Sequence, residues 1–276
     1  MTRDDITALL TDPRFELLPF DSFYDQADQL PEGSKIAVTA SPDLGVDRTV
    51  EVSLDAVERG FEVTPHIAAR GVSDVDHLQD IADQYEEAGI SDLFVVGGDN
   101  EEPVGEFESA HDALVALAEH GYDFEEVGIG GYPEGHQKID DDTLAEALEK
   151  KSPYATYAVT QLCFDPEAII EWTDEVQDRG IDLQVHVGIP GVVKYQRLLQ
   201  ISRKVGVGDS IGFLRKTTGI IGFVKQLVGS RGNYTPDRLV EELAPYGADP
   251  DYPIEGVHLY TFNQAADTEK WRRELV

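Results

Sequence analysis

The sequence contains a single cysteine, Cys163, among 276 residues. One cysteine excludes an internal disulfide and any metal or iron–sulfur site built from several cysteines. The sequence also lacks any run of about 18 apolar residues, the length that a membrane-spanning helix needs. Its first residues, Met1-Thr2-Arg3-Asp4-Asp5, lack the basic and apolar regions of a signal peptide. We therefore expect a soluble, cytoplasmic protein with no membrane partner.

Basic residues are scarce as well. Lys and Arg total 22 against 54 Asp and Glu, which gives a formal net charge of -32, and the excess of acid runs through the whole length. This pattern is typical of halophilic proteins, because molar salt shortens the Debye length to about 3 Å and screens the repulsion between carboxylates. A surface of this charge repels polyanions, so nucleic acid is excluded as a partner.

The glycine motifs of nucleotide-binding folds are incomplete. Gly128-x-Gly130 and Gly206-x-Gly208 each lack the third glycine of G-x-G-x-x-G, and no Walker motif occurs. The sequence therefore gives no fingerprint of a Rossmann fold.

What the sequence does contain is a regular alternation of strand and helix patterns. Apolar segments of strand type recur eight times, and helical patterns separate them, with only a short helix at 21–30 between the first two strands. This alternation predicts one α/β domain over residues 1–276, a (β/α)8 TIM barrel, with a doubly wound open sheet as the alternative. Two further helical patterns, at 209–216 and 220–227, predict extra helices after the seventh strand. The strands are expected at 15–18, 36–39, 61–64, 93–96, 127–129, 157–160, 183–189 and 257–262, and the helices at 48–59, 75–88, 110–120, 143–151, 166–179, 194–205 and 236–246.

Polar side chains collect where these strands end, which is where parallel barrels carry their sites. Glu16 alternates with Phe15 and Leu17, so it points to the opposite side of its strand. If that side is the barrel interior, burial raises the pKa of Glu16 toward a value suited to a general acid; otherwise Glu16 is an exposed carboxylate on an irregular edge. The other candidates at strand ends are Thr39, Ser41, His66, Asp99, Tyr132, His136, Gln161, Asp165, Thr261 and Asn263.

Each of these candidates also has an ordinary structural interpretation. Asp99 follows two glycines that let backbone approach a ligand, but a turn or helix cap would also explain it. Gln161 can read a heterocyclic amide edge or bond to backbone. A zinc site from His66, His136, His186 and His258 lacks any H-x-H or H-E-x-x-H spacing, so we predict no metal.

Taken together, the motifs resemble the methylenetetrahydrofolate reductase family in order and spacing over nearly the whole chain. Two of them, Tyr-Pro-Glu-x-His and Thr-Gln-x-x-Phe-Asp, are specific as a pair. The motifs are Phe15-Glu16-Leu17-Leu18-Pro19, Thr64-Pro65-His66, Gly98-Asp99, Gly131-Tyr132-Pro133-Glu134-Gly135-His136, Thr160-Gln161-Leu162-Cys163-Phe164-Asp165, Gly188-Ile189 and Tyr260-Thr261-Phe262-Asn263.

The resemblance implies an oxidoreductase of one-carbon metabolism and methionine biosynthesis that holds FAD at the strand ends. There a reduced nicotinamide, NADH or NADPH, and a folate substrate take turns at the flavin. By position, Glu16 is similar to the family's general acid, Asp99 to the aspartate beside the flavin pyrimidine, and Gln161 to the glutamine that contacts the pterin. The resemblance further assigns to flavin binding Thr39, His66, Gly98, Tyr132, His136 and Lys150, the last near the phosphates.

Two other functions stay open on the sequence. One is a folate- or flavin-binding accessory subunit without turnover, and the other is a methyltetrahydrofolate-dependent methyltransferase on the same barrel. The sequence does not decide the oligomeric state, and a homo-oligomer is compatible with it.

Overall fold

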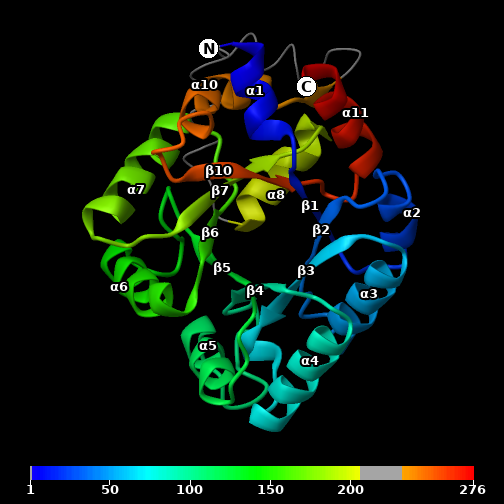
Figure 1. Cartoon of the computed structure of the whole chain (residues 1–276), viewed down its shortest axis with the longest axis vertical. Helices are drawn as coiled ribbons and strands as arrows, with labels where there is room; N and C mark the ends of the chain where they lie inside the picture. Colours follow the sequence, from blue (N-terminus) through cyan, green and yellow to red (C-terminus); the bar gives the residue numbers. More distant parts are fainter. Residues whose placement is uncertain (1, 206–231) are drawn as a thin grey trace.

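A closed barrel of eight parallel strands forms the centre of the protein (Figure 1). The computed structural model describes residues 2–205 and 232–276. Neighbouring strands follow one another in chain order, and the last pairs with the first to close the barrel, which confirms the predicted (β/α)8 fold over the open sheet. The barrel strands are β1 (Arg14–Leu17), β2 (Lys35–Val38), β3 (Glu62–Ala68), β4 (Asp92–Val96), β5 (Glu126–Gly131), β6 (Tyr157–Thr160), β7 (Gln184–Pro190) and β10 (Ile254–Tyr260).

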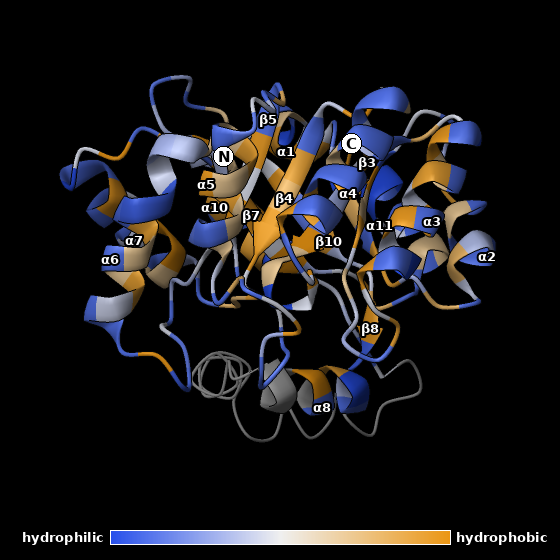
Figure 2. Ribbon diagram, turned by 90° about the horizontal axis from the view of Figure 1, so that it is seen from below, coloured by the Kyte–Doolittle hydropathy of each residue, from blue (hydrophilic) through white to orange (hydrophobic). Residues whose placement is uncertain are grey.

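Helices surround the barrel, and they mix hydrophilic and hydrophobic residues, whereas the strands are mostly hydrophobic (Figure 2). The sequence explains where several of them start. Asp74 caps α4 by accepting a hydrogen bond from the His77 amide, and Asp165 caps α7, whose first residue is Pro166. The helices between strands are α2 (Phe23–Ala27), α3 (Val46–Glu58), α4 (Val75–Glu87), α5 (Ala110–Glu119), α6 (Asp141–Lys151), α7 (Pro166–Asp178), α8 (Tyr195–Val205) and α10 (Asp237–Gly247).

Two helices were not predicted, namely α1 (Arg3–Leu10) and α11 (Ala265–Leu275). Both are rich in charged residues and carry only short apolar patterns, so tertiary packing rather than periodicity identifies them. In α11 the buried Glu269 is held by Arg272 and Arg273. The predicted helices at 209–216 and 220–227 lie outside the described residues.

The third strand also differs from its prediction. The structure extends β3 to Ala68, four residues beyond the expected end. His66 is therefore a side chain within the strand rather than one after it. A proline at position 65 is tolerated there, and β3 remains paired with both β2 and β4. Beyond the strand ends, β8 (Val193–Lys194) pairs antiparallel with β9 (Asn233–Tyr234), and β8 and α8 lie past one end of the barrel (Figure 2).

The two sides of the barrel strands differ in chemistry. Residues such as Leu17, Ile36 and Leu93 are fully buried in the apolar layer between strands and helices. On the inner side, Arg14 donates to Asp92, with Nη2 2.5 Å from Oδ2, and Tyr157 and Thr64 donate to the same carboxylate. This polar layer fills the amino-terminal part of the barrel, below Glu16.

Candidate active site

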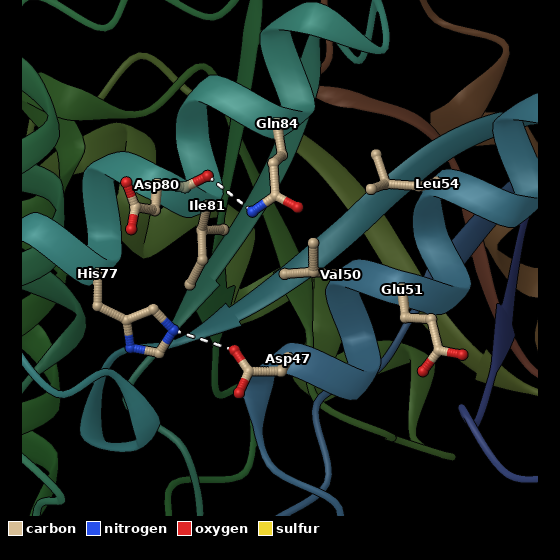
Figure 3. A pocket seen from close by; sticks show the side chains of 8 residues that line it. All are labelled: Asp47, Val50, Glu51, Leu54, His77, Asp80, Ile81 and Gln84. Carbon is tan, nitrogen blue, oxygen red and sulfur yellow. Dashed lines mark hydrogen bonds and ion pairs between the residues drawn. The ribbon is translucent and has the colours of Figure 1, made fainter.

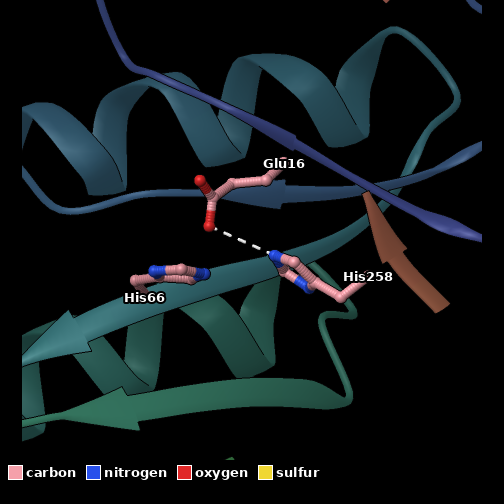
Figure 4. A group of neighbouring side chains, drawn as sticks. All are labelled: Glu16, His66 and His258. Carbon is pink, nitrogen blue, oxygen red and sulfur yellow. Dashed lines mark hydrogen bonds and ion pairs between the residues drawn. The ribbon is translucent and has the colours of Figure 1, made fainter. Parts of the chain in front are cut away.

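Three titratable side chains meet inside the barrel, two from adjacent strands and the third from a strand on the far side of β2. Glu16 comes from β1, His66 from β3 and His258 from β10, and one ligand-type atom of each lies within 4.8 Å of the others. Nε2 of His258 lies 3.1 Å from Oε2 of Glu16 (Figure 4). The side chain of Glu16 is 18% exposed, so the interior alternative from the sequence is the correct one.

Burial controls the protonation of all three groups. It raises the pKa of Glu16 from 4.5 to about 7, opposed in part by the nearby His66. Burial lowers the pKa of His66 to about 4. The charge of Glu16 raises this pKa, whereas His258 and Arg14 lower it further. For His258 burial and then the positive charge of Arg14 lower the pKa to about 3. Around pH 7 both imidazoles are thus neutral, and Glu16 exchanges its proton readily.

Phe94 lies beside these groups and narrows the interior. Its ring centroid is 4.7 Å from that of His66 and 6.4 Å from that of His258. On the other side Tyr260 donates its hydroxyl to the Thr160 carbonyl at 3.0 Å, and burial and the nearby Glu16 raise its pKa further above 10. Apolar and neutral walls of this kind exclude water and favour the uncharged form of Glu16.

Two buried polar atoms near the strand ends have no hydrogen-bond partner within the described residues. They are Oγ1 of Thr39, directly after β2, and Nε2 of His66. Buried polar groups are usually paired, so unpaired ones that face a site indicate a missing ligand. Both residues belong to the set that the family resemblance assigned to flavin binding.

The glycine before Asp99 is required by its backbone conformation and by the space around it. Gly98 has φ +91°, and a Cβ built on it would lie 2.9 Å from the Cβ of Ala68. A larger residue is disfavoured there both by backbone conformation and by space. The turn therefore leads β4 into the mouth loop and leaves Asp99 exposed.

The fifth and sixth strands place the remaining predicted residues. The rings of Tyr132 and His136 lie 5.5 Å apart, and burial raises the pKa of Tyr132, with Asp99 adding to it. His136 also accepts from the Lys138 amide. Gln161 uses Oε1 to accept from the Leu162 amide at 2.8 Å, so part of its polar capacity goes to backbone.

The two lysines at the end of α6 have different surroundings. Lys150, the predicted phosphate contact, is 63% exposed and 3.7 Å from Glu146. Lys151 lies 3.5 Å from the Gly130 carbonyl, and burial lowers its pKa to about 8. The phosphate role of Lys150 stays a prediction.

Of the four histidines considered for zinc, the structure brings two together. His66 and His258 share the site with Glu16, whereas the rings of His186 and Tyr157 are 4.9 Å apart and His136 is in the loop after β5. A metal-bound histidine normally donates from its second nitrogen to an acceptor, but Nδ1 of His258 has no partner within the described residues. Arg14 also makes the site less favourable for a cation, so the prediction of no metal is retained.

The sequence did not identify Arg14, Tyr260 or the role of His258. The two-residue period of strands could have identified Arg14 and Tyr260. Arg14 lies on the same strand face as Glu16, and Tyr260 lies on the same strand face as His258. What the sequence could not give is the register that sets Arg14 of β1 opposite His258 of β10.

A surface hollow lies outside the barrel, between α3 and α4 (Figure 3). Nε2 of His77 lies 3.1 Å from Oδ1 of Asp47. The apolar part of the lining comes from Val50, Leu54 and Ile81. This surface hollow brings together none of the predicted site residues. Among the described helices, none is long and apolar enough to cross a membrane.

The closed barrel and its interior carboxyl group are those of a TIM-barrel protein with a candidate site inside the barrel. Comparison with known proteins narrows this class. The family model of methylenetetrahydrofolate reductase matches residues 20–273. The chain therefore belongs to the methylenetetrahydrofolate reductase family, which is a family of oxidoreductases.

Individual relatives agree with this assignment. The 5,10-methylenetetrahydrofolate reductase of Escherichia coli is 27% identical over 224 residues, which cover 79% of this chain and 72% of that protein. That of Pectobacterium carotovorum is 29% identical over 164 residues, 58% of this chain and 54% of the relative. Methylenetetrahydrofolate reductase 2 of Saccharomyces cerevisiae is 24% identical, and the match covers 88% of this chain but 42% of the yeast protein.

The fold is also similar to that of a solved structure. A crystal structure from Burkholderia cenocepacia J2315 superposes with a TM-score of 0.50 at 10% identity, covering 99% of this chain and 94% of that one. At that identity the likeness concerns the fold alone.

Proposed function

We propose that the protein reduces 5,10-methylenetetrahydrofolate to 5-methyltetrahydrofolate, with a reduced flavin as hydride donor and NADH or NADPH as the reductant that recharges it. The observation that carries this proposal is the buried carboxyl of Glu16 inside the barrel, in a chain of this family. The reaction needs an acid in a site where water is restricted, and Glu16 supplies one.

The substrate carries its methylene carbon between N5 and N10. When the bond from this carbon to N10 breaks, N10 takes a proton and the carbon becomes part of a cationic iminium at N5. A hydride then converts the iminium to the 5-methyl group. Glu16 is the proton donor to N10 in this scheme, and positioned acids contribute roughly 10²- to 10⁴-fold to such steps.

The residues around the strand ends fit a flavin. The unpaired Oγ1 of Thr39 and Nε2 of His66 offer polar contacts, and Gly98 lets backbone approach closely. Tyr132 and His136 would flank the same ligand, and Lys150 would face its phosphates. FAD, when bound, would supply the hydride; the protein's part is to hold it, exclude water and place Asp99 near its pyrimidine end.

The other polar residues have roles that follow from their positions. Asp99 is exposed at the mouth, where its negative charge would stabilise the cationic iminium. Gln161 keeps its amide N–H groups, which would contact the pterin of the substrate, since its oxygen accepts from backbone.

The first experiment is steady-state oxidation of NADH and of NADPH by the purified protein in molar salt, with methylenetetrahydrofolate or an artificial acceptor. We expect oxidation with both acceptors. Turnover with neither would favour the accessory-subunit function. Consumption of methyltetrahydrofolate that requires a methyl acceptor, and no nicotinamide, would favour the methyltransferase function.

Glu16→Gln then tests the acid. We expect folate reduction to fall roughly 10²-fold or more while oxidation by the artificial acceptor stays nearly intact. Glu255→Gln is the matched control, because it makes the same change at an exposed position on the neighbouring strand β10. An equal loss of both reactions in Glu16→Gln would remove Glu16 from this role.

A further inference from the structure

The imidazole of His258 has one polar contact among the described residues, and that contact is Glu16. Its side chain is 2% exposed, Nε2 lies 3.1 Å from Oε2, and Nδ1 is buried without a partner. A residue this confined neither meets solvent nor exchanges protons through Nδ1. Its chemistry is therefore directed at Glu16 alone.

The unpaired Nδ1 decides which nitrogen carries the proton. Because the imidazole is neutral at ordinary pH, only one of its nitrogens is an N–H donor. If that were Nδ1, a buried donor would be orphaned, which is rarer than a buried acceptor without a partner. Nε2 as the donor leaves only an unpaired acceptor, and it gives Oε2 a hydrogen bond whether Glu16 is protonated or ionised.

We propose that His258 is a positioning residue that donates from Nε2 to Oε2 throughout turnover, so that the acidic proton of Glu16 is carried on Oε1. This inference rests on the proposed function for its meaning in the reaction. Figure 4 shows the consequence: the oxygen joined to His258 is engaged, and the other carboxyl oxygen points away from both imidazole rings.

The proton balance of the step then involves no proton transfer by His258. The O–H bond at Oε1 breaks and an N–H bond forms at N10 of the substrate, which leaves a negative charge on the carboxylate. The hydrogen bond from Nε2 becomes charge-assisted at that moment and stabilises the new anion. Water at the partly exposed carboxylate returns the proton between turnovers.

The other titratable groups near Glu16 keep the same charge around neutral pH. The effect of His258 on the pKa of Glu16 can therefore be followed by pH titration. His66 on β3 and His258 on β10 have pKa values lowered to about 4 and about 3. Tyr260 on β10 has its pKa raised above 10, and Arg14 on β1 is the nearby cation. Between about pH 5.5 and pH 9 only Glu16 in this group titrates.

The experiment compares variants with and without a donor at the position of Nε2. His258→Leu removes the donor, and His258→Asn places its amide near the position of Nδ1, away from Glu16. His258→Gln keeps an N–H close to the position of Nε2. His186→Leu is the matched control, since it deletes a half-buried imidazole on the adjacent strand β7, whose ring packs against Tyr157.

Two readouts are measured in parallel. The first is the pH profile of folate reduction, in which we expect His258→Leu and His258→Asn to lose roughly 10- to 100-fold and to shift the alkaline limb to higher pH, because the carboxylate has lost its donor. The second is infrared titration of the protonated carboxyl of Glu16, identified by its loss in Glu16→Gln. This second readout needs no substrate, so it also works if the chain does not reduce folate.

The outcomes separate the two proposals. In support, both donor-free variants raise the infrared pKa of Glu16, whereas His258→Gln and His186→Leu leave it near the wild-type value. An unmoved pKa in a donor-free variant that folds overturns the positioning role, even if folate is reduced. A shifted pKa without any folate reduction in the wild type retains the role of His258 and rejects the proposed function. If His258→Leu fails to fold, His258→Asn decides between these outcomes.

Discussion

Arg14 reaches across the inside of the barrel from β1 to Asp92 on β4, with 2.5 Å between Nη2 and Oδ2 and with both side chains largely buried. Removing one member of a buried ion pair costs about 3–5 kcal/mol, and Asp92→Asn would leave Arg14, among the described residues, only the half-exposed Glu126 as counter-ion, 3.5 Å away. We expect Asp92→Asn to lower the free energy of unfolding by about this amount in denaturant titrations, and the double change Arg14→Met with Asp92→Leu to recover much of it.

The control for this prediction is Lys35→Met, which breaks the exposed pair between Lys35 and Asp12. Exposed pairs contribute about 1 kcal/mol or less. Similar losses in Lys35→Met and Asp92→Asn would show that Arg14 and Asp92 are not an energetically special pair.

Glu16 should make the stability of the protein depend on pH. Its pKa is about 7 in the folded protein against 4.5 ordinarily, so the unfolded chain releases this proton first as pH rises. The stability that the protonated group contributes is present below about pH 4.5 and is lost by about pH 7, up to about 3 kcal/mol. Glu16→Gln should therefore gain stability relative to wild type between pH 5 and pH 8. Parallel midpoints for the two proteins over that range would contradict the buried, neutral carboxyl.

Asp99→Asn tests the charge at the mouth loop. A carboxylate beside the flavin would disfavour its anionic reduced form, so its removal should raise the flavin potential by roughly 30 mV or more, equal to about 1.4 kcal/mol, and slow folate reduction. Potentiometric titration of the flavin-loaded variant measures the shift. Glu101→Gln, at another exposed acid of the same loop, should leave the potential unchanged. An unmoved potential in Asp99→Asn would count against its place beside the flavin.

Chelation tests the donor set of Glu16, His66 and His258. We expect dialysis against EDTA in molar KCl to leave folate reduction and the thermal midpoint unchanged, because the site lacks the acceptor that metal-bound histidines use. A loss of activity that added zinc restores, but that His66→Asn makes insensitive to zinc, would identify the three residues as a metal site.

Salt should stabilise the protein. With a net charge of -32, acidic neighbours repel one another, and screening shortens the Debye length from about 10 Å at 0.1 M to about 3 Å at 1 M. We expect the thermal midpoint and the activity both to rise between roughly 0.1 M and molar KCl. A midpoint that stays flat or falls would show that the acidic surface is no adaptation to salt.

The sequence by itself determined the barrel, because strands and helices have local periods that a single segment displays. It also marked Glu16 as a candidate, since alternation with Phe15 and Leu17 places it on the opposite strand face from both, but alternation alone left open whether that face is the barrel interior. It missed α11, whose charged surface hides a helix until Glu269 and Trp271 are seen buried.

Tertiary structure alone decided which of these residues meet. Glu16 and His258 are 242 positions apart, and they come together through the register between β1 and β10, which the strand patterns do not fix. Likewise, Lys150 and Lys151 are neighbours in sequence, but the turn of the helix exposes the first and leaves the second half-buried. Local patterns set the side of each strand or helix that a residue occupies, whereas the pKa of Glu16 depends on desolvation by groups from distant strands, which only the closed barrel supplies.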